Sequence, residues 1–113
     1  MSSGETWHWT DLEAAYLAAD NPRGQSGFSG DDARWEMARR VIATGIDRDG
    51  AFLDIGCASG YLMETLTRWA AEDDRTIEPY GLDISPALVD LARSRLPHWA
   101  DRIVVGDAFV WRP

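Results

Sequence analysis

Small and acidic residues in the second half of the chain stand where they can act on a ligand. Residues 56–60, with the sequence GCASG, form a loop of small side chains that lets a ligand approach the backbone and opens a helix with free amide donors. Asp83 lies 23 positions after Gly60 (83 − 60), near the ~20-residue offset at which an acidic side chain meets a ribose in dinucleotide folds. Its carboxylate can accept hydrogen bonds from two vicinal hydroxyls at once, which is the chemistry that a ribose requires.

Asp107 and Ala108 form a third candidate group. The Asp107 carboxylate can accept from an exocyclic adenine amine while the amide of Ala108 donates to the ring. Each signal has a purely structural alternative: residues 56–60 as a tight turn without a ligand, Asp83 as a cap on the helix that begins after Ser85, and Asp107 as ordinary turn chemistry. The three groups carry more weight together than any one of them does alone.

Alternating elements place these groups at one edge of a sheet. Apolar runs predict buried strands at about 51–55, 80–84 and 102–105, and periodic apolar residues predict helices at 61–71 and 86–96. The order strand, helix, strand, helix, strand calls for right-handed crossovers and a parallel sheet. Since open α/β sheets bind ligands at the carboxyl ends of their strands, the three groups are expected to meet there.

Two helices are expected before the first strand. Residues 10–13 (TDLE) match a capping box, which predicts a helix over about 11–19. Glycines and a proline in 21–30 predict a loop, although Phe28 is unusual in a solvent-facing linker. A second helix begins near residue 31 and ends near Gly45, with one expected apolar face made of Trp35, Ala38, Val41 and Ile42.

Composition narrows the classes of function. Acidic side chains outnumber basic ones by 19 to 11, the net charge is −8 and the chain has no lysine, so a nucleic acid is a poor partner. Cys57 is the single cysteine, which excludes an intrachain disulfide and is typical of a reducing compartment. The sequence shows neither a signal peptide nor an apolar run near the ~20 residues of a membrane span, and a cytoplasmic protein is expected.

Residues 52–62, FLDIGCASGYL, resemble the first motif of class I S-adenosylmethionine-dependent methyltransferases. Residues 80–86, YGLDISP, are similar to the next segment of that family, and residues 106–108 to its adenine-contacting turn. The resemblance implies a Rossmann-like three-layer α/β fold, represented by its first three parallel strands in the order 3-2-1. It also implies S-adenosyl-L-methionine as the cofactor.

The resemblance further implies a set of cofactor-binding residues. Asp83 binds the ribose, and Asp107 with Ala108 contacts the adenine. The methionyl part is flanked by Asp54, Gly56, Ala58 and Gly60. Ala58 departs from the family, which often has a glycine there, and its methyl group is expected to shift the affinity for the cofactor. The complete implied set is Asp54, Gly56, Cys57, Ala58, Gly60, Asp83, Ile84, Asp107 and Ala108.

Other ligands and chemistries fit the sequence less well. A nicotinamide or flavin dinucleotide requires G-x-G-x-x-G, whereas this loop reads G-x-x-x-G, and a Walker motif requires a lysine. Cys57 with His98 or His8 lacks the third group that orients a thiol nucleophile, and no spacing of histidines and acids predicts a metal site. Four tryptophans could line an aromatic cleft but stay unassigned: Trp7, Trp9, Trp99 and Trp111.

The resemblance covers about residues 31–113, and residues 1–30 are expected to form a separate N-terminal helix and loop. The family's domain usually has seven strands, and acceptor-side residues often follow the fourth, so no catalytic residue and no methyl acceptor is assigned. The chain alone is expected to transfer no methyl group, and to form a homo-oligomer or be completed by another chain. Two alternatives remain: a catalytically silent cofactor-binding or assembly module, and a fragment of a nicotinamide-dependent oxidoreductase.

Overall fold

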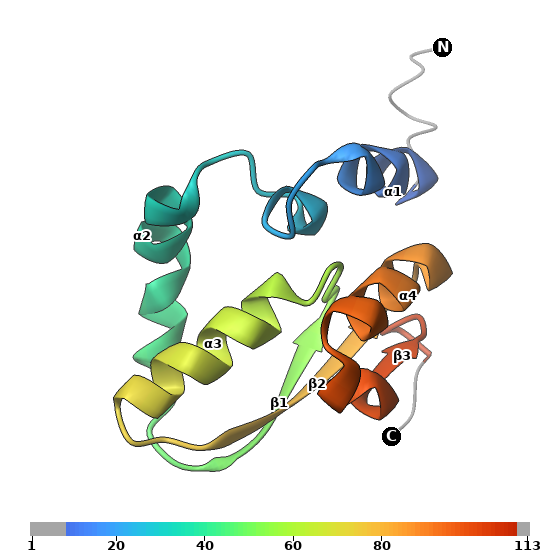
Figure 1. Ribbon diagram of the computed structural model, residues 1–113. Helices are drawn as coiled ribbons and strands as arrows, with labels where there is room; N and C mark the ends of the chain where they lie inside the picture. The colour runs from blue at the N-terminus through green and yellow to red at the C-terminus, as the bar shows by residue number, and fades with distance from the viewer. Residues whose placement is uncertain (1–8, 111–113) are drawn as a thin grey trace.

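The computed structural model describes residues 9–110, so that Trp7 and Trp111 lie outside the described residues. None of the helices in this part of the chain is long and apolar enough to cross a membrane. In chain order (Figure 1), the elements are α1 (Trp9–Ala18), the 3-10 turn η2 (Gly24–Ser26), α2 (Asp32–Ala43), β1 (Gly50–Ile55), α3 (Tyr61–Glu72), β2 (Ile77–Asp83), α4 (Pro86–Arg95), the 3-10 segment η3 (Pro97–Arg102) and β3 (Ile103–Val105).

The three strands form one parallel sheet with β2 in the middle. The register pairs Ile55 of β1 with Leu82 of β2, and Leu82 in turn with Val104 of β3. The prediction of an α/β fold with parallel strands in the order 3-2-1 is confirmed. All three strands therefore end at the same edge of the sheet.

The second strand is longer than predicted, because it begins at Ile77 and includes Pro79. The sequence predicts a strand over 80–84 with Pro79 confined to its start, which is wrong. Only Gly81–Asp83 of β2 pair with β3, so Pro79 lies in the half of β2 that has a strand neighbour on one side only. A proline, which has no N–H to donate, is tolerated there.

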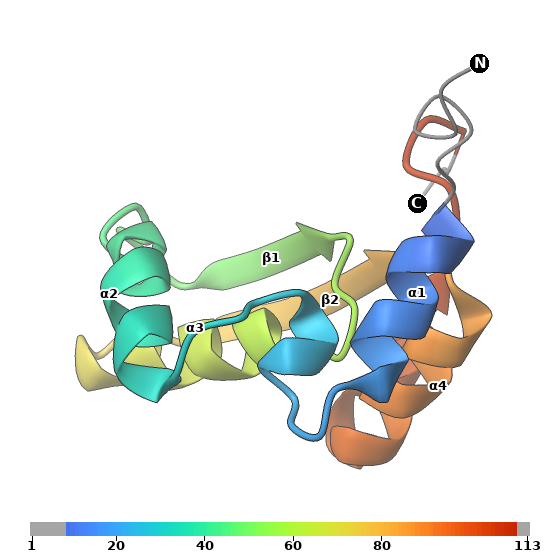
Figure 2. The ribbon, with the colours of Figure 1, turned by 90° about the horizontal axis from the view of Figure 1, so that it is seen from above.

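Helices α3 and α4 cover one face of the sheet (Figure 2). The predicted apolar stripes are largely confirmed, with Leu66, Trp69, Leu88 and Leu96 all buried. Ser85 is the N-cap of α4, as predicted, because its hydroxyl oxygen accepts from the amide of Leu88 at 3.0 Å. These two helices fix the loops that leave β1 and β2.

The predicted apolar face of α2 is wrong except for Trp35. Val41 is 65% exposed and Ile42 is 39% exposed, whereas Trp35 and Ala43 are buried. Among the described elements only α3 packs closely against α2, so two buried residues, Trp35 and Ala43, suffice. Trp35 packs edge-on against Phe28 with ring centroids 5.2 Å apart, which explains the phenylalanine in the preceding loop.

Helix α1 lies across the carboxyl ends of the strands and beside α4 (Figure 2). It begins at Trp9, so Thr10 lies inside the helix and the predicted capping box is wrong. The hydroxyl of Ser85 instead donates a hydrogen bond to the Glu13 carboxylate. Glu13 therefore accepts a hydrogen bond from a residue distant in the sequence and does not cap its own helix.

The face of the sheet opposite α3 and α4 is open in the described part of the chain. Leu53 is 39% exposed, Ile55 61% and Tyr80 38%. The sequence predicts a buried first strand, which is wrong for this face because neither α1 nor α2 covers it (Figure 2). Among residues 9–110, β1 also pairs with β2 alone and leaves its other edge unpaired.

Candidate functional site

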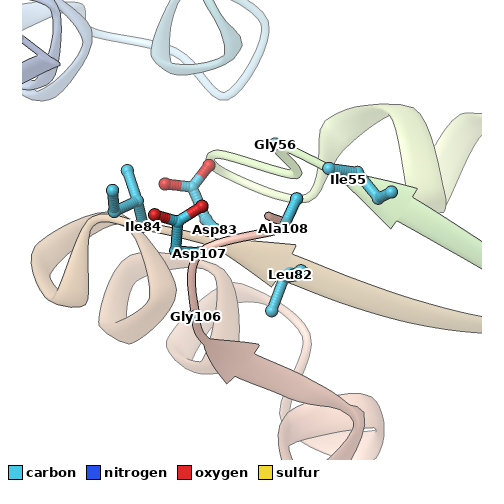
Figure 3. A pocket seen from close by; sticks show the side chains of 8 residues that line it. All are labelled: Ile55, Gly56, Leu82, Asp83, Ile84, Gly106, Asp107 and Ala108. Atoms are coloured by element: carbon cyan, nitrogen blue, oxygen red, sulfur yellow. The ribbon is translucent and has the colours of Figure 1, made fainter. Parts of the chain in front are cut away.

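A cavity of about 220 Å³ opens where the three strands end (Figure 3). We call it the strand-end cavity. Backbone and side chains from the loops after β1, β2 and β3 all contribute to its wall, as expected for an open parallel sheet. Its lining residues are Ile55, Gly56, Leu82, Asp83, Ile84, Gly106, Asp107 and Ala108.

A second cavity of about 230 Å³ lies between α1 and the start of α4. We call it the α1 cavity. It shares Gly56, Asp83 and Ile84 with the strand-end cavity, so the two adjoin on either side of these residues. Its complete lining is Leu12, Glu13, Tyr16, Gly56, Asp83, Ile84, Ser85 and Leu88.

Asp83 lies at the junction of the two cavities and is held by two backbone amides. Its Oδ2 accepts from the amide of Ala58 at 2.9 Å, and its Oδ1 accepts from the amide of Ser85 at 2.9 Å. The residue is only 8% exposed, and its carboxylate links the loop after β1 to the loop after β2. Each oxygen retains a lone pair, so a ligand can still donate to both.

The alternative interpretation of Asp83 as a helix cap is wrong in detail. Ser85 itself caps α4, and Asp83 accepts from the amide of Ser85, which precedes the helix. The carboxylate is thus oriented by local structure and at the same time lines both cavities. Structural and ligand-binding roles are compatible at this residue.

The glycine loop presents fewer free amides than its sequence suggests. The amides of Gly56 and Cys57 both donate to the carbonyl of Leu82, at 2.7 and 3.0 Å. The amide of Ala58 donates to Asp83, and that of Gly60 donates to the carbonyl of Cys57 at 2.8 Å. Four of the amides that could cradle a phosphate are therefore used within the protein.

The two glycines of the loop have different roles. Gly56 has φ +78°, lines both cavities, and a Cβ built there would meet nothing within 4 Å, so space for a ligand lies in front of it. Gly60 has φ +81°, and a Cβ there would lie 2.7 Å from Cδ1 of Leu96. Gly60 therefore permits close packing of α3 on α4 and lines neither cavity.

Ala58 lies in the left-handed region, with φ +47°. Such a backbone favours glycine, which accounts for the glycine that the resembled family often has at this position. The residue is 3% exposed and does not line either cavity. Its methyl group is therefore buried outside both cavities, and the expected effect on cofactor affinity stays a prediction.

Cys57 points into the core and not into a cavity. It is 2% exposed and packs with Met63, Val89 and Ile103. Burial, with the nearby negative charges of Asp54 and Asp83, raises the pKa of the Cys57 thiol to about 12. The thiol stays protonated at neutral pH, which removes it as a nucleophile.

Asp54 lies next to the site but lines neither cavity. Burial raises the pKa of its carboxyl to about 6 from the ordinary 3.8, and the negative charge of Asp83 adds to the shift. The side chain therefore changes its charge near neutral pH. Of the residues predicted to flank a methionyl group, only Gly56 reaches a cavity.

Asp54→Asn is expected to stabilise the protein at pH 8 and to leave its stability unchanged near pH 4. The folded state binds the Asp54 proton more tightly than the unfolded chain does. The stabilisation that comes from this proton is therefore fully present below pH 3.8 and is lost as pH rises through about 6. A shift of this size corresponds to about 1–3 kcal/mol. Urea unfolding at both pH values measures it, with Asp90→Asn on the exposed side of α4 as control; an equal gain at both pH values would contradict the prediction.

Asp107 and Ala108 line the strand-end cavity, as does Ile84 (Figure 3). The turn is held by a hydrogen bond from the amide of Gly106 to the carbonyl of Asp83, at 2.9 Å. The Asp107 carboxylate accepts from the amide of Phe109 at 2.9 Å, so part of its role is turn chemistry. Five of the nine predicted site residues thus line the cavities: Gly56, Asp83, Ile84, Asp107 and Ala108.

Sequence reasoning missed the contribution of α1. Leu12, Glu13 and Tyr16 line the α1 cavity together with Ser85 and Leu88. The three residues of α1 belong to no ligand-binding motif, and the sequence around them carries no signal for a ligand. Ser85 alone was detectable, as a helix cap.

The charge of the two cavities is one-sided. Glu13, Asp83 and Asp107 contribute carboxylates, and among residues 9–110 no arginine or histidine lines either cavity. Within residues 9–110, no group of three or more His, Cys, Asp or Glu side chains is placed to hold a metal ion. The site is suited to a ligand that donates hydrogen bonds or carries positive charge.

Comparison with known proteins gives matches among solved structures only, since no family model and no curated protein matches the chain. A SAM-dependent methyltransferase from Geobacter sulfurreducens, solved in complex with S-adenosyl-L-homocysteine, is 22% identical with a TM-score of 0.53. That alignment covers 90% of this chain and 38% of the other. YjhP from E. coli is 20% identical with a TM-score of 0.51, over 88% of this chain and 37% of the other.

The chain thus spans little more than a third of the length of these two structures. At such identities the likeness concerns the fold and not the chemistry. The described chain has a Rossmann-like α/β fold, built on three parallel strands, of the kind found in a known S-adenosylmethionine-dependent methyltransferase.

Proposed function

We propose that the chain is the cofactor-binding part of an S-adenosylmethionine-dependent methyltransferase. Asp83 carries the proposal: two backbone amides orient its carboxylate at the junction of both cavities, where a ribose diol can donate to it. Ile84 and Ala108 supply apolar surface for an adenine in the strand-end cavity. S-adenosylmethionine supplies an electrophilic methyl group, and this chain's residues hold the adenosine.

Two observations favour this ligand over a dinucleotide. The amides of Gly56, Cys57 and Ala58, which would have to bind a pyrophosphate, donate to protein acceptors instead. The described residues that line the cavities also include carboxylates and no basic side chain. Such a charge repels a pyrophosphate and is compatible with a sulfonium or ammonium group. Both observations disfavour a nicotinamide-dependent oxidoreductase.

Calorimetric titration tests the proposal directly. S-adenosylhomocysteine is expected to bind the purified 113-residue chain, and reduced nicotinamide cofactors are expected not to bind or to compete. Binding of the nicotinamide compound alone would replace the proposal with the dinucleotide alternative.

Absence of methyl transfer by the chain alone stays a prediction, for which tritium transfer from labelled cofactor to a small-molecule extract is the assay.

The 113-residue chain is expected not to be a stable monomer in solution. Leu53 and Ile55 are exposed on the open face, and β1 has an unpaired edge within the described chain. An apolar edge strand is a template for pairing, and a two-fold dimer is the simplest closed arrangement. Sedimentation equilibrium at micromolar concentration measures this, and a monodisperse 12.6 kDa species that binds no hydrophobic dye would contradict it.

A further inference from the structure

Ser85 joins two carboxylates at the base of the α1 cavity. Its amide donates to Asp83 Oδ1 at 2.9 Å, and its hydroxyl donates to Glu13 Oε2. The same hydroxyl oxygen accepts from the amide of Leu88 at 3.0 Å, which fixes its position at the start of α4. The carboxylate of Glu13 is therefore held near that of Asp83, although the residues are 70 positions apart in the sequence (83 − 13).

The segment after α1 ties this helix to the glycine loop. The hydroxyl of Ser59, which is 0% exposed, donates to the carbonyl of Pro22 at 2.6 Å and lies 2.6 Å from the hydroxyl of Ser26. Gly27 has φ +82°, and a Cβ there would collide with the ring of Tyr16, so that ring packs directly on the glycine backbone. Hydrogen bonds and packing therefore hold α1 in place as one wall of the site.

Glu13 has acceptor capacity that the described residues do not use. Its Oε2 accepts from Ser85, whereas its Oε1 has no hydrogen bond from the described residues. Asp83 is in a similar state, since each of its oxygens accepts one backbone amide and can accept one more donor. Two carboxylates with free lone pairs thus line one cavity, with no basic side chain among the described residues of its wall, and they match a neutral group with two hydroxyl donors.

We propose that Glu13 belongs to the ligand site, and that the carboxylates of Glu13 and Asp83 bind a vicinal diol, one hydroxyl each. The inference rests on the proposed function, because S-adenosylmethionine would supply the diol as its ribose. It adds a residue from α1 to a site whose recognisable motifs all lie after residue 50. Glu13 then determines specificity for a ribose that has both hydroxyls.

Calorimetry with S-adenosylhomocysteine and with its 2′-deoxy and 3′-deoxy analogues tests the assignment. Glu13→Ala is expected to weaken S-adenosylhomocysteine about 10- to 100-fold, the usual cost of a lost hydrogen bond to a charged acceptor. Glu13→Gln keeps an acceptor for Ser85 and is expected to lose less. For the analogue that lacks the hydroxyl bound by Glu13, wild type and Glu13→Ala are expected to bind alike. Asp90→Asn, which removes one carboxylate from the exposed side of α4, is the control and is expected to bind as wild type does.

The outcomes separate three cases. A wild type that binds no S-adenosylhomocysteine would overturn the proposed function and this assignment with it. A wild type that binds, with Glu13 variants of unchanged affinity, would overturn the assignment alone. An equal loss for all three ligands would also overturn it, because Glu13 would then only anchor α1 through Ser85. Urea unfolding of Glu13→Ala, compared with Glu13→Gln, would show whether that anchor had been lost.

Discussion

Gly56→Val is expected to abolish binding of both S-adenosylmethionine and S-adenosylhomocysteine. A Cβ at Gly56 meets no atom within 4 Å beyond its chain neighbours, and Gly56 lines both cavities where they adjoin. A branched side chain would occupy that space, and the ligand would have to give up contacts there. We expect a loss of at least ~100-fold, about 3 kcal/mol, by calorimetry.

Backbone strain has to be separated from this steric effect. Gly56 has φ +78°, so any side chain there also strains the loop. Gly50, at the opposite end of β1, provides a matched control because it also has a positive φ, +154°, and open space around its Cβ position. Gly50→Val is expected to change stability and to leave ligand affinity unaltered. A folded Gly56→Val protein that binds normally would refute the assignment of the loop.

Asp83→Ala is expected to weaken S-adenosylmethionine and S-adenosylhomocysteine by similar amounts, because both carry the same ribose. A hydrogen bond to a charged acceptor contributes about 1.5–3 kcal/mol, so the loss of the hydroxyl that Asp83 binds corresponds to roughly 10- to 100-fold. The substitution also leaves the amides of Ala58 and Ser85 without their acceptor, at about 1–3 kcal/mol for each that stays buried. Affinity and free energy of unfolding should therefore fall together.

A control at the other end of the sheet distinguishes the two effects. Asp49 also accepts a backbone hydrogen bond between loops, from the amide of Thr76 at 2.7 Å, and lies outside both cavities. Asp49→Ala is expected to reduce stability modestly and to leave ligand affinity unchanged. Unchanged affinity in a folded Asp83→Ala protein would remove Asp83 from the site and leave it a purely structural residue.

Local sequence was sufficient for the order of elements and for the residues at the strand ends. Short apolar runs, the proline after Ser85 and the small residues at 56–60 each specify a strand, a helix start or a tight turn through nearby contacts. Parallel pairing then brings the ends of the strands to one edge, as a consequence of the order of elements. Asp83 and Asp107 could therefore be placed in one site without a structure.

Tertiary structure decided which of these residues reach the cavities. Cys57 and Gly60 stand in the loop as expected, yet one turns its sulfur into the core and the other packs on Leu96. The loop amides are satisfied by Leu82 and Asp83, which come from a neighbouring strand. A sequence pattern gives the spacing of residues along the chain, and it does not give the direction in which a loop residue points.

The contribution of α1 depended on tertiary structure entirely. In the sequence, Glu13 matches a local capping box, but its carboxylate accepts a hydrogen bond from Ser85 at the start of α4. Hydrogen bonds that join segments 30 or more positions apart, such as that from Ser59 to Pro22, leave no periodicity or spacing in the sequence. The sequence by itself thus determined the sheet and the residues at its ligand-binding edge. Only packing between distant segments decided that α1 lies over that edge, because such contacts depend on the folded positions of both partners.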